Sequence, residues 1–231
     1  MKSDVLIIGA GPSGSAAALA LARQGAKVTV LEKTVFPREK TCGDGLTPRA
    51  IASLADLGID IAQEPFIRHV VTQTMGSRNQ CTVELAGNGI ATTIPRSVLD
   101  NRIAEAATAA GASIRFATSV EQLIVEDSSV GGVVTRNPNG SIERLVAPVT
   151  LLGEGSVGKL RSQAPLREVR GVHRCFAARR YWEGVEFSFK DASYEITFPL
   201  ESNGHPVVGY GWVFPMGDGI ANVGVGYFTL G

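Results

Sequence analysis

An α/β fold, with a buried parallel sheet and a second, mostly antiparallel sheet, is predicted by three features of the sequence. The chain begins with a continuous apolar run that leads at once into a glycine-rich turn and a helix pattern. A β-branched run follows, as expected for two parallel strands joined by a crossover helix. Toward the end of the chain, strand patterns of alternating polarity recur between turn signals.

The composition is typical of a globular protein and argues against several classes. Of the 231 residues, 44% are hydrophobic, and 22 Lys and Arg balance 22 Asp and Glu without a basic stripe, so we expect no nucleic-acid partner. Each apolar run is shorter than the ~18 residues of a membrane-spanning helix. The first residues lead directly into a strand pattern, so we expect no signal peptide and a cytoplasmic protein.

Neither a disulfide framework nor a metal site is expected. The cysteines are widely spaced and form no CxxC pair: Cys42, Cys81 and Cys175. The histidines lie in separate segments without the spacing of metal ligands: His69, His173 and His205. We therefore assign no residue to a metal.

The turn after the first strand pattern has the GxGxxG form. Residues 4–8 read Asp-Val-Leu-Ile-Ile, and the apolar run after Asp4 is typical of a strand buried on both faces. Gly9 would permit the tight turn, Gly11 would let a pyrophosphate approach the backbone, and Gly14 would let the helix lie close to the strand. Ser13 lies within the same turn, so we count it among the cofactor-binding candidates.

The second strand pattern, residues 26–31, stops at Glu32. Its distance from the turn is close to the ~20 residues expected for the acid that accepts hydrogen bonds from ribose hydroxyls. Strand, turn, helix, strand and acid together predict a Rossmann-like site for an adenine dinucleotide. The pattern alone does not distinguish FAD from NAD.

A second glycine loop and two late motifs carry a more specific likeness. They read Cys42-Gly-Asp-Gly-Leu-Thr-Pro-Arg49, Tyr210-Gly-Trp-Val-Phe-Pro215 and Asn222-Val-Gly224. With the GxGxxG turn and Glu32-Lys33, they resemble the geranylgeranyl reductase family, FAD-dependent enzymes with a p-hydroxybenzoate hydroxylase-like fold that reduce isoprenoid double bonds. The cysteine loop is most similar to that of bacterial menaquinone side-chain reductases. The likeness covers the whole chain.

The resemblance implies that FAD is the cofactor, with NADPH or another reductant as electron donor. It also implies that Cys42 lies beside the flavin ring, where a thiol is a candidate catalytic group; the alternative is a cysteine that only packs. Other residues at which the resemblance implies FAD contacts are Lys33, Gly43, Gly45, Arg96 and the backbone of Val120. Arg96 could instead be a surface residue at the start of a helix.

The middle of the chain suggests two interleaved domains. Alternating patterns near residues 70–85 predict a hairpin, and the turn Asn137-Pro-Asn-Gly140 predicts an antiparallel meander over 120–146. Helices are expected at 49–57 and 97–110, and parallel strands at 112–116 and 149–152. We assign an FAD-binding domain to 1–65 and 95–161, and a partial substrate domain to 66–94 and 162–231.

The loop after the last parallel strand departs from related flavoproteins. An aspartate is usual where this chain has Glu154, and a serine is usual where it has Gly158, whereas Arg161 is retained. Glutamate keeps the charge but is longer by one methylene. We expect Glu154 to lie near the pyrophosphate with a shifted contact.

The last third of the chain is expected to bind substrate. Tyr210, Trp212 and Phe214 alternate in a strand pattern, so they share one face and could form an aromatic wall for a long apolar chain. The alternative is that the three rings only fill a core. The resemblance favours the wall, because the same segment helps to shape the family's prenyl cavity.

The leading hypothesis is reduction of an isoprenoid C=C bond in a prenyl lipid or quinone, with peripheral contact to the inner face of a membrane. An aromatic monooxygenase or halogenase of the same fold is the second hypothesis. Family members continue past Gly231 to a further FAD-binding segment. We therefore also consider an inert product, or weak FAD binding unless a second chain supplies the rest.

Overall fold

The computed structural model describes residues 2–61, 70–75, 79–83, 91–165, 174–186, 193–198 and 200–229. The chain forms two compact units. The first comprises Met1–Glu39 and Ser97–Glu168, and the second comprises Lys40–Arg96 and Val169–Gly231. The interleaved α/β organisation expected from the sequence is therefore confirmed.

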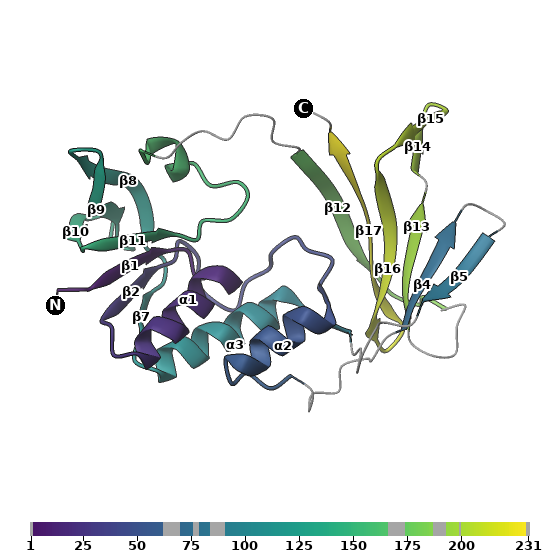
Figure 1. Ribbon diagram of the computed structural model, residues 1–231, viewed down its shortest axis with the longest axis horizontal. Helices are drawn as coiled ribbons and strands as arrows, with labels where there is room; N and C mark the ends of the chain where they lie inside the picture. The colour runs from purple at the N-terminus through teal and green to yellow at the C-terminus, as the bar shows by residue number, and fades with distance from the viewer. Residues whose placement is uncertain are drawn as a thin grey trace. The chain divides into compact units, whose positions relative to one another are not determined.

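The first unit is built on a parallel sheet of four strands in the order β11-β1-β2-β7 (Figure 1). Its strands are β1 (Val5–Ile8), β2 (Val28–Leu31), β7 (Ser113–Arg115) and β11 (Val149–Leu152). Its helices are α1 (Pro12–Arg23) between β1 and β2, and α3 (Arg96–Ala109) before β7. The crossover helix and the parallel pairing of β1 with β2 agree with the sequence pattern.

Strand β1 is buried on both faces, which explains its continuous apolar run. Ile7 faces α1, since its Cγ2 lies 3.4 Å from the position of a Cβ on Gly14. Leu6 and Ile8 face the other way, into a cluster with Leu123 and Val133 of the meander.

The meander consists of β8 (Ser119–Glu126), β9 (Ser129–Arg136) and β10 (Ile142–Val146), all antiparallel. The predicted turn closes it: the Asn137 N–H donates to the Ser141 carbonyl at 2.9 Å. A short 3₁₀ helix, η1 (Leu160–Gln163), follows β11. The meander prediction is therefore confirmed.

The second unit contains a six-stranded sheet in the order β12-β17-β16-β13-β4-β5. All neighbours are antiparallel except β13 and β4, which run parallel. The strands are β4 (Val70–Met75), β5 (Asn79–Val83), β12 (Arg174–Trp182), β13 (Ser193–Phe198), β16 (Gly209–Gly217) and β17 (Ile220–Thr229). The mostly antiparallel sheet expected for the substrate domain is thus present.

Smaller elements complete the second unit. These are β3 (Gly45–Leu46) paired with β6 (Thr92–Thr93), the helix α2 (Pro48–Asp56), and the hairpin of β14 (Leu200–Ser202) and β15 (His205–Val207). The boundary between the compact units lies at Lys40, whereas the sequence analysis placed residues 40–65 in the FAD-binding domain. The reason is long-range: β3 pairs with β6, and the loop before it bonds to side chains of β12 and β17.

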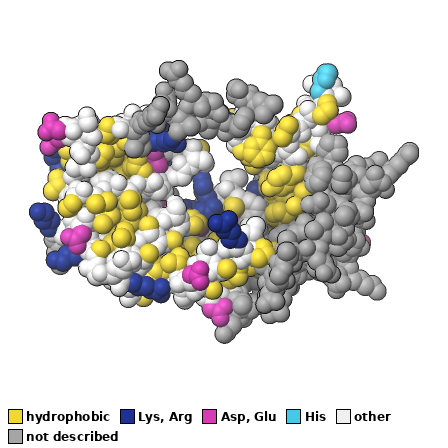
Figure 2. Space-filling model, in the orientation of Figure 1, with side chains coloured by type: hydrophobic (Ala, Val, Ile, Leu, Met, Phe, Trp, Pro, Cys, Tyr) yellow, Lys and Arg dark blue, Asp and Glu magenta, His cyan; other side chains and the backbone are white. Residues whose placement is uncertain are grey.

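Apolar side chains are exposed on strands of the second unit (Figure 2). The large ones on β12, β16 and β17 are Phe176, Tyr181, Trp182, Tyr210, Val225, Tyr227 and Phe228. Across the described residues, no helix is long and apolar enough to cross a membrane.

Candidate functional site

Two glycines of the GxGxxG turn in the first unit are required by close contacts within the protein. Gly9 has φ +94°, and a Cβ there would lie 2.5 Å from the carbonyl oxygen of Gly153. A Cβ on Gly14 would lie 1.9 Å from the carbonyl oxygen of Gly9. Only glycine lets α1 start this close to β1 and β11.

Gly11 is different, because the described part of the chain gives no steric reason for a glycine there. Among those residues, a Cβ on Gly11 would meet nothing nearer than the Arg38 guanidinium, at 3.9 Å. Among the described residues, no side chain caps the α1 N-terminus at Gly11. The helix therefore presents its positive end beside open space, an arrangement that suits a phosphate group.

Arg38, which the sequence analysis did not single out, lies at this open space. Its Nη2 pairs with Asp100 Oδ2 at 3.1 Å, and its guanidinium covers the Phe36 ring at 4.8 Å. Its Nη1 is buried and has no hydrogen-bond partner among the described residues. The guanidinium edge that lies beside Gly11 is Nη2, and a cation at this position suits a diphosphate. The pairing joins α3 to a loop far away in sequence, so no local pattern could have indicated it.

Glu32 is buried, and its carboxylate is held in place by the backbone. Oε2 accepts the Ala10 N–H at 2.8 Å, and Oε1 accepts the Thr34 N–H at 2.9 Å and the Thr34 hydroxyl at 2.6 Å. Oε2 accepts only one of these bonds and can accept a further one. The acid is thus fixed between the glycine turn and the end of β2, where the sequence predicted a ribose ligand.

Glu154 is engaged by its own chain. Its two carboxylate oxygens accept the N–H groups of Leu160 and Arg161, each at 3.0 Å, and so cap η1. A Cβ on Gly158 would lie 2.0 Å from Glu154 Cδ, so a larger residue there would displace the Glu154 side chain from its two capping bonds. The two departures from related flavoproteins are therefore one matched change, while a pyrophosphate contact of Glu154 stays a prediction.

In the second unit, the three predicted aromatics share one face of β16, as expected. The centroids of Tyr210 and Trp212 are 5.8 Å apart, and those of Trp212 and Phe214 are 6.1 Å apart. The indole lies across the neighbouring strand β17, where a Cβ on Gly224 would be 2.2 Å from its Cζ2. The glycine of the Asn-Val-Gly motif therefore makes room for the tryptophan.

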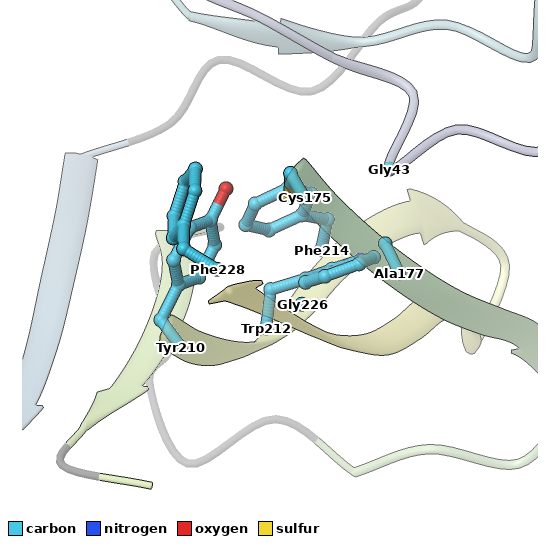
Figure 3. Close-up of a pocket in the computed structure, with 8 residues that line it drawn as sticks. All are labelled: Gly43, Cys175, Ala177, Tyr210, Trp212, Phe214, Gly226 and Phe228. Atoms are coloured by element: carbon cyan, nitrogen blue, oxygen red, sulfur yellow. The ribbon is translucent and has the colours of Figure 1, made fainter. Parts of the chain in front are cut away.

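These rings border an apolar cavity of about 210 Å³ (Figure 3). Its lining comes from β12, β16, β17 and one loop: Gly43, Cys175, Ala177, Tyr210, Trp212, Phe214, Gly226 and Phe228. Tyr210 is 40% exposed and Phe228 43% exposed, so the cavity has an open side. We refer to it as the aromatic pocket.

The Cys42–Gly45 loop reaches this pocket through Gly43. A Cβ on Gly43 would lie 3.3 Å from the Phe214 ring and 3.4 Å from the indole nitrogen of Trp212. Cys42 is a half-buried free thiol and is not among the lining residues. The loop therefore meets the aromatic wall with its backbone.

Asp44 is the buried acid of this loop, and sequence reasoning missed it. It is 2% exposed and has φ +61°. Its Oδ2 accepts the Tyr181 hydroxyl at 2.5 Å and the Asn222 amide at 2.8 Å. Burial raises the pKa of the Asp44 carboxyl, although both hydrogen bonds and the charge of Arg179 oppose the shift.

The predicted site residues thus fall into two groups, one in each unit. The first unit holds Gly9, Gly11, Ser13, Gly14, Glu32, Lys33, Val120 and Glu154. The second unit holds Cys42, Gly43, Gly45, Arg96, Tyr210, Trp212 and Phe214. Lys33 and Ser13 are exposed, and Arg96 and Val120 are half-buried. His69 and His173 lie outside the described residues, and His205 is exposed on β15.

Comparison with known proteins decides the family. Residues 2–207 match the sequence profile of the family described as "FAD binding domain". The chain belongs to this family. FAD is therefore the cofactor. The residues just described can be compared with the groups that FAD would need as partners.

Relatives of this chain include proteins named as reductases. The chain is 36% identical over 235 residues to a menaquinone reductase of Mycolicibacterium smegmatis, covering 97% of this chain and 55% of the relative. It is 28% identical over 228 residues to digeranylgeranylglycerophospholipid reductase 2 of Methanopyrus kandleri, covering 98% and 55%. The chain thus spans about half the length of the curated relatives it matches.

Solved structures agree on the FAD-binding fold. A geranylgeranyl bacteriochlorophyll reductase-like protein of Thermoplasma acidophilum superposes with a TM-score of 0.81 at 28% identity, over 97% of this chain and 56% of that protein. A myxobacterial chondrochloren halogenase reaches the same TM-score at 21% identity, covering 99% and 53%. The halogenase likeness shows the fold alone.

The first unit fits the adenine and diphosphate part of FAD. The α1 N-terminus, the side of Gly11 and the Arg38 guanidinium beside it suit the diphosphate, and Glu32 suits the ribose. Lys33 follows Glu32 directly and is exposed at the same strand end. In the described part of the chain, no group of His, Cys, Asp and Glu could hold a metal ion.

Proposed function

We propose that this protein takes part in FAD-dependent reduction of isoprenoid C=C bonds. The observation that carries the proposal is the aromatic pocket, whose wall consists of Tyr210, Trp212 and Phe214. A prenyl chain offers no hydrogen-bonding groups, so it binds by burying apolar surface against rings of this kind. The names of the relatives support a prenyl lipid or a prenylated quinone as the substrate class.

The chemistry divides between cofactor and protein. When bound in its two-electron-reduced form, FAD supplies a hydride for one carbon of the double bond, while a proton must reach the other carbon. NADPH or another reductant would restore the two electrons. The pocket residues would orient the alkene and exclude water, because an apolar wall displaces solvent from the reacting carbons.

Cys42 remains our candidate for the group nearest the flavin ring. It is a half-buried free thiol in the loop that borders the pocket. If the thiol acts in the reaction, Cys42→Ser should lower turnover strongly and change the flavin spectrum. Unchanged turnover and spectrum would leave Cys42 a packing residue. Cys175→Ser is the comparison for loss of a thiol that lines the pocket but lies outside the Cys42–Gly45 loop.

Contact with a membrane surface is a finer part of the proposal. Prenyl lipids reside in membranes, and exposed rings on β12 and β17 offer apolar contacts: Phe176 is 48% exposed and Trp182 is 57% exposed. The test is sedimentation with liposomes of mixed anionic and neutral lipids. Recovery wholly in the supernatant would overturn membrane contact. A second chain in the working enzyme is likewise a proposal, which sedimentation equilibrium and partner capture would test.

The deciding experiment uses the FAD-loaded protein, reduced without oxygen and incubated with geranylgeraniol or a prenylated quinone. The expected product gains the mass of two hydrogen atoms per double bond. Trp212→Ala should reduce product formation, whereas Trp182→Phe should not, because Trp182 does not line the pocket. Absence of any mass gain from a protein that carries reduced FAD would overturn the proposed function. Oxygen consumption with an aromatic substrate would instead favour a monooxygenase.

A further inference from the structure

One row of the sheet beside the aromatic pocket carries a buried amide. The strand registers pair Tyr181 with Asn222 and Asn222 with Phe214, so these three residues form a row across β12, β17 and β16. The next row, Arg179, Gly224 and Trp212, carries the indole. Asn222 is 0% exposed, and an amide buried in this way needs partners for its hydrogen-bonding groups.

Asn222 finds those partners on three separate parts of the unit. Its Oδ1 accepts the Trp212 indole N–H at 3.0 Å. Its Nδ2 donates to the Cys42 carbonyl at 2.9 Å and to Asp44 Oδ2 at 2.8 Å. The opposite orientation of the amide would set its oxygen against two acceptors, so the network fixes the amide direction. One side chain thus connects the aromatic wall, the loop backbone and the loop acid.

Asp44 is secured from two further sides. The Tyr181 hydroxyl donates to the same oxygen, Oδ2, at 2.5 Å. The Asp44 carbonyl accepts the Ile94 N–H at 2.9 Å. The other carboxylate oxygen, Oδ1, is buried without a hydrogen-bond partner in the described part of the chain, although the Arg96 backbone N–H interacts weakly with the carboxyl. Asp44 therefore acts through Oδ2, as an acceptor of two bonds.

Gly43 lies between the two anchored residues of the loop, Cys42 and Asp44, and directly against the rings of Trp212 and Phe214. Any shift of the loop or of the indole would change the width of the pocket at this point. A change of about 1 Å matters, because apolar contacts lose much of their attraction over such a gap.

We propose that Asn222, Asp44 and Tyr181 are positioning residues that hold the Cys42–Gly45 loop and the Trp212 indole in a fixed relation and thereby set the width of the aromatic pocket. The inference rests on the proposed function in one respect, namely that the pocket receives a prenyl chain. None of the three residues lines the pocket. Their effect on a ligand is therefore indirect.

The test uses the indole N–H of Trp212 as a reporter. The chain has two tryptophans, and Trp182 is 57% exposed, so Trp182→Phe leaves one indole N–H resonance. In this background, ¹⁵N-labelled FAD-loaded protein is titrated with geranylgeraniol. The variants are Asn222→Ala, Asp44→Ala and Asp44→Asn. Tyr227→Phe is the control for loss of a hydroxyl, because Tyr227 stacks on Phe176 and does not line the pocket.

Asn222→Ala should move the indole resonance upfield, because the N–H loses its acceptor, and should weaken geranylgeraniol binding roughly tenfold. Asp44→Ala should weaken binding similarly. Asp44→Asn should bind nearly as the parent, because an amide oxygen can accept the same two bonds. Parent-like binding by both alanine variants, or Asp44→Asn as weak as Asp44→Ala, would overturn the positioning role.

A folding failure of Asn222→Ala does not block the test. Tyr181→Phe removes one of the two bonds to Asp44 and keeps the ring under Arg179, whose guanidinium lies 4.1 Å from it. It should weaken binding by a smaller factor than Asp44→Ala, whereas Tyr227→Phe should not. If geranylgeraniol leaves the indole N–H resonance of the parent unchanged, the proposed function is overturned. The shift of that resonance in Asn222→Ala would still decide whether Asn222 holds the Trp212 indole.

Discussion

The glycines of β17 allow a matched pair of substitutions. A Cβ on Gly224 would lie 2.2 Å from Trp212 Cζ2 and 2.7 Å from the backbone carbonyl oxygen of Ala178. A Cβ on Gly226 would find its nearest neighbours at 3.6 Å, among them the Cβ of Ala177. The first contact cannot be relieved by side-chain motion alone, whereas the second is an ordinary van der Waals contact.

The cost of Gly224→Ala follows from these contacts. Moving a backbone carbonyl and a buried ring out of the way costs about 1–3 kcal/mol, as for other overpacked cores. The Trp212 indole is 7% exposed in the parent protein. Its displacement also breaks the 3.0 Å bond to Asn222, and this loss adds about 1 kcal/mol to the cost. We expect Gly224→Ala to lower the free energy of unfolding by about 2–4 kcal/mol. Gly226→Ala should change it by less than about 1 kcal/mol, because alanine suits a strand better than glycine does.

Urea unfolding of both variants in the Trp182→Phe background, followed by Trp212 emission, measures the difference through the transition midpoint. Geranylgeraniol affinity provides a second readout, since Gly226 lines the pocket and Gly224 lies beneath the indole. Equal midpoints for Gly224→Ala and Gly226→Ala would refute the packing argument.

Three further predictions concern other polar contacts. In fluorescence titrations of FAD, Arg38→Leu should weaken FAD binding, and Asp100→Asn should weaken it by a smaller factor. Unchanged FAD affinity of Arg38→Leu would remove Arg38 from the diphosphate site. Gly158→Ser should cost roughly 1–3 kcal/mol in urea unfolding beside Glu154, but much less in a Glu154→Ala background, because the two capping bonds are already lost there. Since burial raises the pKa of Asp44, the parent should lose stability relative to Asp44→Asn as pH rises from 3.8 through the raised value. A stability difference that does not change between pH 4 and pH 7 would contradict the raised pKa of Asp44.

Much of the fold could be predicted because its signals are local. The apolar run of β1, the steric demands of Gly9 and Gly14, and the turn at Asn137 each depend on residues close together in sequence. The alternation of Tyr210, Trp212 and Phe214 likewise fixes a shared face as soon as the segment is a strand. These expectations agree with the structure.

The missed residues depend on pairing across long stretches of sequence. The bond of Tyr181 to Asp44 joins residues 137 positions apart, and that of Asn222 to Asp44 joins residues 178 positions apart. No periodicity encodes such a pairing, since it exists only after β12 and β17 have met. The assignment of residues 40–65 to the first domain differed from the observed packing for the same reason.

The interleaving of the two units has a consequence for synthesis on the ribosome. Strand β1 is made well before β11, one of its two sheet neighbours, which begins only at Val149. Until then one edge of β1 has no partner, and a bare apolar strand edge invites association with other chains. By then Lys40–Arg96 of the second unit have also been made, but β12 and β17 have not. Nascent chains should therefore need protection by chaperones until β11 has been made. Ribosome-bound chains that stop before Val149 should be cleaved by protease more readily than chains that include β11.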